Sequence, residues 1–354
     1  MNLDKIRTCV DKIDSEILRL LNKRMEFAIR TKFFKSDIAD LSRESKIFES
    51  VKSQSRWLVD PQFSEKLFGQ ILDESKRLQT LDINLVGFQG EHGAMSEMAI
   101  GKLNEKKSSK YISIPCSEYA EILEGVKTSA LNFGVVPIEH SLEGGVSQVN
   151  DLLVESDLYI IGEIYLPVHY CFLALKETDY RDIKVVYSHP QSLGHCRGFI
   201  SRNKLEARPY HDTAGAALML VKDRPTASGV IAGRLAAELY GLEVLMDEIE
   251  DHKAMNARYA VLAKEPKKDG GSKTSIVFSA KHAAGSLHGI LQLFATDGIN
   301  LTRIESRPLK KDPGQFVFLL DFEANSNDEK IKKLLQKVEE QAQFYKFLGS
   351  YNKE

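Results

Sequence analysis

The sequence predicts a chain of three domains with different fold classes: an all-α segment at residues 1–80, two α/β lobes at residues 81–266 and an α+β module at residues 267–354. Three observations lead to this prediction. The length of 354 residues exceeds that of most single domains. Apolar residues recur at helical spacing in the first segment, and strand-like and helix-like stretches alternate in the second. The third segment follows a charged, glycine-ended linker.

The composition excludes several classes of protein. Hydrophobic residues make up 43% and charged residues 28% of the chain, which suits soluble globular domains. The formal net charge is −2, and no basic stripe with interleaved aromatic residues stands out, so nucleic-acid binding has no support. No apolar run approaches the roughly 20 residues that span a membrane. The N-terminus also lacks the apolar core of a signal peptide.

The four cysteines indicate a reducing compartment. They are scattered along the chain without CxxC spacing, at Cys9, Cys116, Cys171 and Cys196. Such cysteines are typical of reduced thiols rather than of a disulfide frame or a zinc site. We therefore expect a cytoplasmic protein.

The N-terminal segment begins with one long amphipathic helix. Its apolar positions are three and four residues apart: Ile6, Val10, Ile13, Ile17, Leu20, Leu21, Phe27 and Ala28. Arg7 and Arg24 lie on or beside this stripe, and Lys35 returns to the same face if the helix continues. A single cation at the edge of a stripe usually extends into water, but three cations on one face favour an anion site.

The spacing of the two arginines adds a constraint. Seventeen helical residues span about 25 Å, so one small dianion cannot contact both Arg7 and Arg24 of the same straight helix. Either the chain folds back or a partner helix supplies one arginine, as an antiparallel dimer would.

Two more helices are predicted before residue 80. After a polar break, Arg43 and Glu44 begin the second helix, and Pro61 precedes the third. Ser75 and Gln79 are four residues apart and therefore share one face of the third helix.

These residues together resemble the all-helical chorismate mutase family. That family has an early arginine, an arginine about seventeen residues later, a lysine eleven beyond it, Asp-x-x-Arg-Glu and Ser-x-x-x-Gln. The matching residues are Arg7, Arg24, Lys35, Asp40, Arg43, Glu44, Ser75 and Gln79. The resemblance implies that they form the catalytic site for chorismate and that Arg7 comes from the partner subunit.

The chemistry of that rearrangement suits these residue types. A pericyclic reaction needs no nucleophile, only a site that holds a flexible dianion in a compact conformer and stabilises a charged ether oxygen. Arginines clamp carboxylates in bidentate fashion. Lys35 and Gln79 are suited to donate to the ether oxygen, and Glu44 to bind the hydroxyl.

The stretch Gly134–Val146, GVVPIEHSLEGGV, organises the middle of the chain. It is typical of a buried strand that ends in polar residues and glycines before a helix at residues 149–154. Ligand sites in α/β proteins form at such strand ends, where glycine lets backbone N–H groups approach an anion. An ordinary strand–turn–helix crossover has the same pattern, so this stretch alone leaves both interpretations open.

The neighbouring stretches alternate between strand and helix. Strands are expected at residues 83–88, 160–168, 170–175 and 185–187. Helices are expected through Met98 and Ile100, after the turns at residues 188–196 and 212–217, and at residues 230–240, where Gly241 stops the last one. This alternation argues for parallel sheets.

The histidines of this region do not form a metal motif. The five between residues 140 and 211 show no HxxxH spacing, and the nearby acids complete no triad. No G-x-S-x-G elbow surrounds the Ser-His-Pro-Gln run. We expect neither a metal nor a cofactor.

Six phrases taken in order resemble the prephenate dehydratase family, with the related arogenate dehydratases: GEHGAMSE, VVPIEHSLEGG, IIGEIYLPVHY, YSHPQSLGHC, DTAGAA and AAELYGL. The resemblance covers essentially all of residues 83–264. It implies a dehydratase site formed by Glu139, His140, Ser141, Ser188, His189, Gln191 and Arg258. The chain departs from the family in two places: His140 stands where asparagine is usual, and Ala257 stands where a threonine is thought to serve the leaving hydroxyl.

Ala257 bears directly on the expected reaction. Prephenate loses a carboxylate as carbon dioxide and a hydroxyl as water, and hydroxide departure needs a proton or a strong hydrogen bond. Deleting one such donor typically costs on the order of 10²–10³ in rate. His140, Asn256 and His252 are candidate replacements for the missing donor. The two histidines could serve as the acid because histidine titrates near neutrality. Without a donor, the domain would be silent and only bind ligand, or it would be a prephenate decarboxylase whose product keeps the hydroxyl.

The C-terminal segment shows the element order βαββαβ. Strands are expected at residues 275–278, 299–304, 316–322 and near 347–351, with helices at residues 287–294 and 331–338. This order is ferredoxin-like.

Two motifs of this segment resemble the ACT domain fused to prephenate dehydratases. The resemblance implies that phenylalanine binds between subunits at Gly285, Ser286, Leu287, Glu305, Ser306, Arg307 and Pro308. A dimerisation module without an effector is the alternative.

We therefore expect a three-domain enzyme of phenylalanine biosynthesis that converts chorismate to prephenate and prephenate to phenylpyruvate, with feedback by phenylalanine. Its expected partners are these small molecules and a second copy of the chain, as a homodimer or homotetramer. The rival interpretations are a chorismate mutase with a silent binding module and a prephenate decarboxylase.

Overall fold

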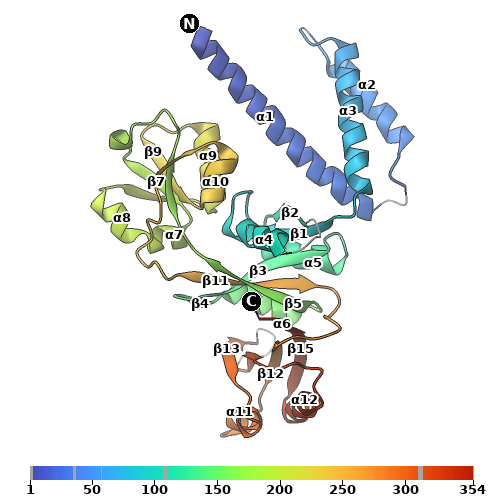
Figure 1. Ribbon diagram of the computed structural model, residues 1–354, viewed down its shortest axis with the longest axis vertical. Helices are drawn as coiled ribbons and strands as arrows, with labels where there is room; N and C mark the ends of the chain where they lie inside the picture. Colours follow the sequence, from blue (N-terminus) through green and yellow to red (C-terminus); the bar gives the residue numbers. More distant parts are fainter. Residues whose placement is uncertain (1–2, 35–36, 57, 107–110, 310–313, 354) are drawn as a thin grey trace. The chain divides into compact units, whose positions relative to one another are not determined.

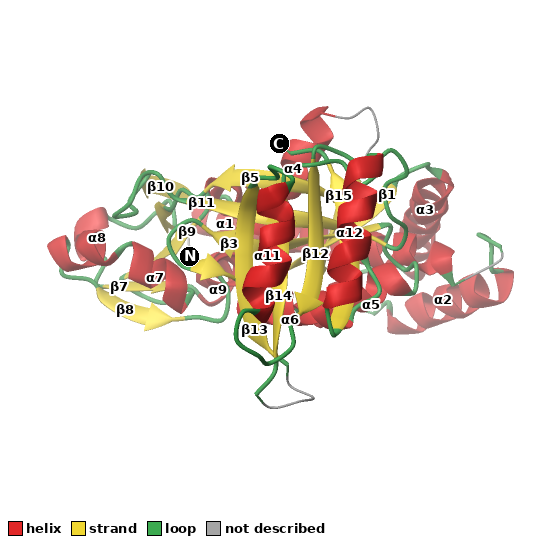
Figure 2. Ribbon diagram, turned by 90° about the horizontal axis from the view of Figure 1, so that it is seen from below, coloured by secondary structure: helices red, strands yellow, loops and turns green. Residues whose placement is uncertain are grey.

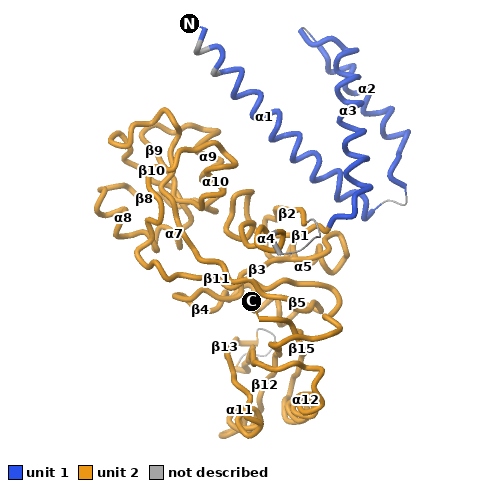
Figure 3. The backbone as a smooth tube through the Cα atoms, viewed as in Figure 1, with its two compact units in different colours: residues 1–83 blue, residues 84–354 orange. Residues whose placement is uncertain are grey.

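The computed structural model describes residues 3–34, 37–56, 58–106, 111–309 and 314–353. The chain divides into two compact units, residues 1–83 and residues 84–354 (Figure 3). The domain boundary predicted at residue 266 falls inside the second unit and stays a prediction. No helix within the described ranges combines the length and the apolar character needed to cross a bilayer.

The described part of the first unit is helical, as predicted. It comprises α1 (Leu3–Arg30), a 3₁₀ turn (Thr31–Phe33), α2 (Leu41–Gln54) and α3 (Pro61–Thr80). The Asp40 carboxylate accepts from the Arg43 backbone N–H and so caps α2. Asp60 caps α3 in the same way, just before Pro61. Lys35 was expected on the face of Arg24 only if the helix continued; α1 ends at Arg30, and Lys35 itself lies outside the described residues.

The apolar stripe of α1 is exposed over most of its length. Its residues keep between 45% and 59% of their surface in contact with solvent: Leu3, Ile6, Val10, Ile13, Ile17 and Leu20. Only near its C-terminal end does α1 bury an apolar side chain, Ile29, which is 3% exposed. A long exposed apolar stripe is unusual on a monomeric soluble protein.

The first lobe of the second unit is built on a mixed sheet with the order β2-β1-β3-β11-β5, and β4 pairs with β3 (Figure 1). Its elements are β1 (Asn84–Gln89), α4 (Met95–Lys106), β2 (Tyr111–Cys116), α5 (Tyr119–Lys127), β3 (Phe133–His140), β4 (Gly144–Gly145), α6 (Ser147–Glu155), β5 (Tyr159–Pro167) and β11 (Asn256–Ala263). The central strand β3 is buried over most of its length, as the organising stretch predicted.

The second lobe has a sheet with the order β10-β6-β9-β7-β8. Its elements are β6 (Cys171–Ala174), a 3₁₀ turn (Tyr180–Asp182), β7 (Val185–Ser188), α7 (Pro190–His195), α8 (Arg197–Arg202), β8 (Glu206–Pro209), α9 (Thr213–Asp223), β9 (Ser228–Ala232), α10 (Arg234–Tyr240) and β10 (Glu243–Met246). The chain enters this lobe after β5 and returns to the first lobe through β11.

Two predictions for these lobes were wrong. Both sheets are mixed rather than parallel, because β11 runs antiparallel to β3 and β5, and β6 runs antiparallel to β9 and β10. Residues 230–232 belong to the buried strand β9, and only residues 234–240 form the helix α10. Gly241 does end that helix, in the left-handed conformation with φ +66° that glycine adopts readily.

The C-terminal part of the second unit has the predicted βαββαβ order. It comprises β12 (Lys273–Ser279), α11 (Ser286–Thr296), β13 (Leu301–Pro308), β14 (Phe316–Phe322), α12 (Glu329–Gln341) and β15 (Phe344–Tyr351). The sheet order is β13-β14-β12-β15, and α11 and α12 lie side by side on one face (Figure 2). At Gly349, a side chain would place Cβ 2.1 Å from the Ile160 carbonyl oxygen, so glycine permits the close approach of β15 to β5.

Candidate active and effector sites

The first unit brings three of the predicted mutase residues together at one end of α1. Arg24 Nη1 donates to Ser75 Oγ at 2.7 Å, and Ser75 Oγ donates to the Ile71 carbonyl. Gln79 Nε2 donates to the Ala28 carbonyl at 2.8 Å, so α1 and α3 are joined through polar side chains. Burial lowers the pKa of Arg24 from its ordinary value, which reflects a guanidinium held partly out of water.

The other predicted mutase residues that the structure describes lie elsewhere. Asp40 caps α2 through the Arg43 N–H at 3.0 Å, and Glu44 pairs with Lys76 of α3 at 3.4 Å. Arg7 is exposed near the other end of α1, about 25 Å of helix from Arg24. The structure therefore does not bring Arg7 into the Arg24 group within one chain.

The loop after β3 forms the first-lobe side of the candidate dehydratase site. His140 pairs with Ala257 across the antiparallel strands β3 and β11, so their side chains share one face of the sheet. Ser141 closes onto β11, where its N–H donates to the Asn256 carbonyl and its Oγ accepts from the Asn256 N–H at 3.0 Å. Glu143 lies two residues after Ser141, and its side chain contacts residues of the second lobe.

The second-lobe side is built around α7. Ser188 ends β7 and is fully buried, with Oγ donating to the Ile231 carbonyl at 2.6 Å. His189 caps α7 by accepting from the Gln191 backbone N–H. Glu143 accepts from Gln191 Nε2 and lies 2.8 Å from His195 Nε2, so the structure joins Gln191 to the Glu139–Ser141 loop. Sequence reasoning missed Glu143 and His195 as site residues, although both lie inside the quoted motifs.

A second bridge between the lobes involves the GEHGAMSE turn. Asp212 caps α9 through the Ala214 and Gly215 N–H groups, and its carboxylate also accepts from the Glu91 N–H of the first lobe at 2.9 Å. Tyr240 of α10 donates to the His92 carbonyl at 2.7 Å. The two glycine-containing motifs that the sequence placed at strand ends therefore face the second lobe.

Two histidines of the site, His140 and His189, favour the neutral form. Burial lowers the pKa of His140. The Glu143 carboxylate acts to raise this pKa, and His195 acts to lower it further. Burial also lowers the pKa of His189, while the carboxylates of Asp212 and Glu143 oppose the change. Both rings therefore carry little positive charge near neutral pH.

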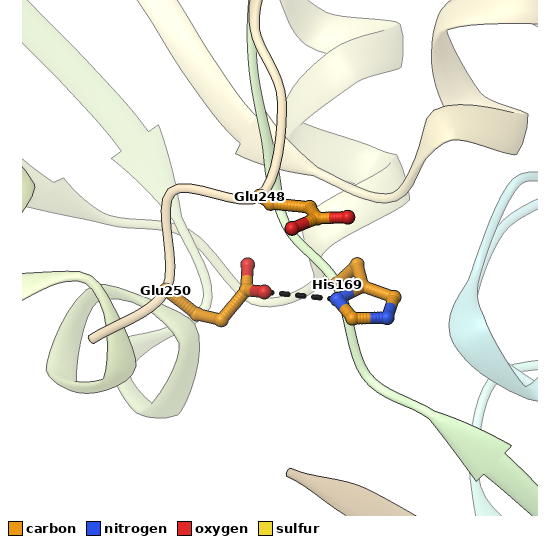
Figure 4. Close-up of side chains that lie close together, drawn as sticks. All are labelled: His169, Glu248 and Glu250. Atoms are coloured by element: carbon orange, nitrogen blue, oxygen red, sulfur yellow. Dashed lines mark hydrogen bonds and ion pairs between the residues drawn. The ribbon is translucent and has the colours of Figure 1, made fainter. Parts of the chain in front are cut away.

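The two chain crossovers between the lobes are fastened to each other by Glu250. One carboxylate oxygen accepts from the Tyr170 N–H at 2.9 Å and the other lies 2.9 Å from His169 Nδ1 (Figure 4). Glu248 lies beside them, and Lys253 Nζ approaches Glu248 at 3.5 Å and Glu250 at 3.8 Å. This cluster has metal-ligand chemistry, but the Lys253 ammonium offsets part of its negative charge, and the bonds of Glu250 to His169 and Tyr170 hold the crossovers together.

Arg258 pairs with the predicted dehydratase residue Glu139, but at the C-terminal sheet rather than where the β3 loop meets α7. It follows Ala257 on β11 and its side chain points to the C-terminal sheet, where it pairs with Asp321 at 2.7 Å and donates to Tyr351 Oη at 3.0 Å. It also pairs with Glu163 at 2.7 Å, and Glu139 approaches it at 3.3 Å. Burial acts to lower the pKa of Arg258, but Asp321 together with Tyr351, Glu163 and Tyr165 outweighs it, so the pKa is raised. Arg258 and Glu139 thus meet at the junction of two sheets.

The predicted effector motif is split between the two faces of the edge strand β13. Glu305 accepts from Asn150 Nδ2 of α6 at 3.0 Å, and Arg307 pairs with Asp151 of α6 at 2.7 Å. Ser306 and Pro308 alternate with them and are exposed. Gly285 precedes α11 with φ +82°, and Ser286 and Leu287 open that helix.

A pocket of about 630 Å³ lies beside the same strand. Arg307 and Pro308 line it together with α6, the start of β5 and the aromatic residues Phe344, Tyr345 and Phe347. Lys346 also lines it and donates to the Leu153 carbonyl at 2.7 Å. Burial lowers the pKa of Lys346 to about 8.

Comparison with known protein families agrees with this architecture. Residues 86–267 match the family Prephenate dehydratase, residues 6–80 match Chorismate mutase type II and residues 274–340 match the ACT domain. The Aquifex aeolicus protein named bifunctional chorismate mutase/prephenate dehydratase is 34% identical over 361 residues, which cover 99% of this chain and 98% of that protein.

Two further relatives match about three quarters of the chain. The Arabidopsis thaliana protein named arogenate dehydratase/prephenate dehydratase 2, chloroplastic, is 37% identical over 75% of this chain and 72% of its own length. The crystal structure of prephenate dehydratase from Arthrobacter aurescens in complex with L-Phe superposes with a TM-score of 0.69 at 29% identity, covering 76% of this chain and 90% of that one. This chain therefore belongs to the family of bifunctional chorismate mutase/prephenate dehydratases, with a C-terminal ACT domain.

Proposed function

We propose that this chain catalyses two consecutive steps of phenylalanine biosynthesis and senses the end product. The first unit rearranges chorismate to prephenate, and the junction of the two α/β lobes converts prephenate to phenylpyruvate. The match to a bifunctional relative over nearly the whole of both chains carries this proposal. The reaction chemistry needs no redox or group-carrying cofactor.

The mutase site is completed by a second copy of the chain. Arg24, Ser75 and Gln79 form one half-site, whereas Arg7 is about 25 Å of helix away and cannot reach the same dianion. The exposed apolar stripe of α1 supports a partner helix along this face. In an antiparallel homodimer, the partner's Arg7 would clamp the second carboxylate, as a bidentate arginine does. Lys35 is proposed to stabilise the ether oxygen on the grounds of its motif position.

The dehydratase site is the region where the β3 loop meets α7. Ser141, His189 and Gln191 supply polar groups there, and Glu143 fastens the lobes to each other. The electrons of the departing carboxylate enter the ring as carbon dioxide leaves, and the ring expels its hydroxyl. Aromatisation drives the step, so the barrier lies in hydroxide departure, which needs a proton donor. Ala257 has no proton to give.

Phenylalanine feedback has a physical route from the ACT domain to the dehydratase loop. Glu305 and Arg307 of the effector motif hold α6, and α6 begins two residues after Gly145. A side chain at Gly145 would place Cβ 1.8 Å from Glu305 Oε2, so the carboxylate lies directly on the end of the loop that carries His140 and Glu143. Movement of β13 on effector binding would shift that loop.

Chorismate supplied to the purified full chain tests this proposal. Prephenate should appear first and phenylpyruvate second, both identified by mass and ultraviolet spectrum. Arg24→Ala should abolish chorismate consumption but leave conversion of supplied prephenate intact, whereas Arg19→Ala, a change at an exposed arginine of the same helix, should alter neither step. Accumulating prephenate would indicate a silent dehydratase domain. A product that has lost only carbon dioxide would indicate a decarboxylase.

A further inference from the structure

The replacement of threonine by Ala257 leaves the dehydration without its expected donor. We propose that Tyr170 donates the proton to the departing ring hydroxyl and that His195 and Glu143 replace that proton through a hydrogen-bonded chain. This inference rests on the proposed dehydratase function and names the catalytic group that makes it work in this chain.

The geometry is that of a hydroxyl, an imidazole and a carboxylate in series. Glu143 Oε1 lies 2.8 Å from His195 Nε2, and His195 Nδ1 lies 3.4 Å from the Tyr170 hydroxyl. A carboxylate and a ring nitrogen at 2.8 Å must share a proton, because both would otherwise be acceptors. Glu143 therefore fixes the ring orientation and directs Nδ1 to the tyrosine. Ser192 Oγ donates to the Tyr170 oxygen at 3.1 Å, and a doubly protonated His195 donates to the same oxygen from Nδ1, so the hydroxyl proton is directed away from both.

The chain is assembled from both lobes and from the crossover between them. Glu143 comes from the first-lobe loop after β3, His195 ends α7 in the second lobe, and Tyr170 lies on the outgoing crossover. Tyr170 is held in place by its backbone, whose N–H donates to Glu250 and whose carbonyl accepts from the Ile249 N–H. Proton delivery thus requires that the lobes be closed on each other, which also keeps water from the reacting ring.

The backbone that leads to Tyr170 also lies beside the backbone that leads to Ala257. The Val168 N–H, two residues before Tyr170, donates to the Met255 carbonyl, two residues before Ala257. Tyr170, Ala257 and Tyr259 belong to one buried cluster. The crossover therefore runs beside the start of β11, where the family threonine would stand.

The donors considered from the sequence fit less well. Asn256 alternates to the opposite face from Ala257 and donates to the Ala254 carbonyl. His252 is exposed. His140 does share the face of Ala257, but burial lowers its pKa, so near neutrality it is mostly deprotonated and a poor acid.

The proton balance of the step is complete. The Tyr170 O–H bond breaks as its proton joins the departing hydroxide to form water, while the bond to the ring carboxylate breaks and its electron pair enters the ring. His195 passes its proton to the tyrosine oxygen, with Glu143 stabilising the charged ring, and is reprotonated from water. One proton is consumed per prephenate, and carbon dioxide, water and phenylpyruvate are released. Burial raises the pKa of Tyr170, so the hydroxyl holds its proton at the start of each turnover.

Three variants of the full chain test the assignment with prephenate as substrate. Tyr170→Phe removes only the hydroxyl and should lower kcat for phenylpyruvate formation on the order of 10²–10³-fold with little change in KM. His195→Gln and Glu143→Gln should lower kcat by smaller factors. Tyr180→Phe, the same change at a tyrosine bonded to Asn203 away from this junction of the lobes, should have no effect. Chorismate consumption by the first unit should be unchanged throughout, and an unchanged urea transition of the second unit verifies that the mutated unit of each variant is folded.

Adding Ala257→Thr to Tyr170→Phe should restore dehydration, because the family donor then returns. A Tyr170→Phe chain that keeps its kcat within twofold would overturn the assignment while leaving the proposed function standing. A wild-type chain that makes no phenylpyruvate, but gains that activity through Ala257→Thr alone, would overturn both.

Discussion

Replacement of Arg258 by methionine tests whether this residue joins two domains rather than acting on substrate. The guanidinium is 3% exposed and pairs with Glu163 and Asp321, each at 2.7 Å, so methionine removes the shared cation from two buried carboxylates. Breaking a buried ion pair from one side typically costs about 3–5 kcal/mol. Neither carboxylate is left alone, because Glu163 keeps Lys273 at 2.9 Å and Asp321 keeps the Ser275 hydroxyl. We therefore expect the lower end of that range, about 3 kcal/mol.

Urea unfolding of the full chain measures this loss. The single tryptophan, Trp57, belongs to the first unit, so its fluorescence reports that unit while near-ultraviolet circular dichroism of the tyrosines reports mainly the second. Only the unfolding transition of the second unit should shift, to a lower urea concentration. Arg208→Met, at an exposed pair with Glu206, is the matched control and should change the unfolding free energy little.

A double-mutant cycle sharpens the same test. Asp321→Asn in the Arg258→Met background should cost less than in the wild type, because the partner cation is already gone. Unchanged stability in Arg258→Met, combined with a selective loss of dehydration, would refute this reasoning and support the catalytic role that the motif resemblance implied.

Three further predictions concern the assembly, the effector and acid stability. Arg7→Ala and Arg24→Ala should each abolish mutase activity as homodimers, and mixing the two after subunit exchange should restore about a quarter of it, because half the dimers then contain one intact site; no recovery would exclude a shared site. Arg307→Met should keep phenylpyruvate formation but weaken inhibition by phenylalanine, since its bonds to Asp151 and Ser147 tie β13 to α6; an unchanged inhibition curve would contradict that route. Burial acts to raise the pKa of Asp321, but Arg258 and Arg303 outweigh it and the pKa is lowered. This carboxyl therefore contributes stability above its unfolded pKa of about 3.9 and loses it as the pH falls further. The second unit should thus weaken below about pH 4 in an acid series of urea titrations, and Asp321→Asn should flatten that slope.

Much of the fold could be predicted because local patterns agreed with tertiary packing. The three N-terminal helices and the βαββαβ order follow from periodicity and caps such as Asp60-Pro61. The strand at residues 230–232 was mistaken for helix, because a short apolar run before a helix has no period of its own. The mixed sheets were missed because β11 pairs with β3, which lies more than a hundred residues earlier. The local sequence around β11 carries no signal for this pairing.

The relative positions of candidate site residues could be predicted where the residues belong to one sequence motif. Ser75 and Gln79 share a face, as their spacing requires, and Arg24 meets Ser75. Resemblance alone assigned Arg258 to the dehydratase site. Because side chains alternate along a strand, Arg258 lies on the other face of β11 from Ala257, which explains why it faces the C-terminal sheet. The Tyr170–His195–Glu143 chain joins three motifs through tertiary contacts that no single motif reveals.

The most direct test of the central claim is the product formed from prephenate by the purified full chain at neutral pH. Acid-catalysed dehydration without enzyme must be subtracted, and the product is identified by mass and ultraviolet spectrum. Phenylpyruvate above that background is the predicted result and would show that the second unit dehydrates prephenate although residue 257 is alanine. Unchanged prephenate, or a decarboxylated product that still carries the hydroxyl, would contradict the account.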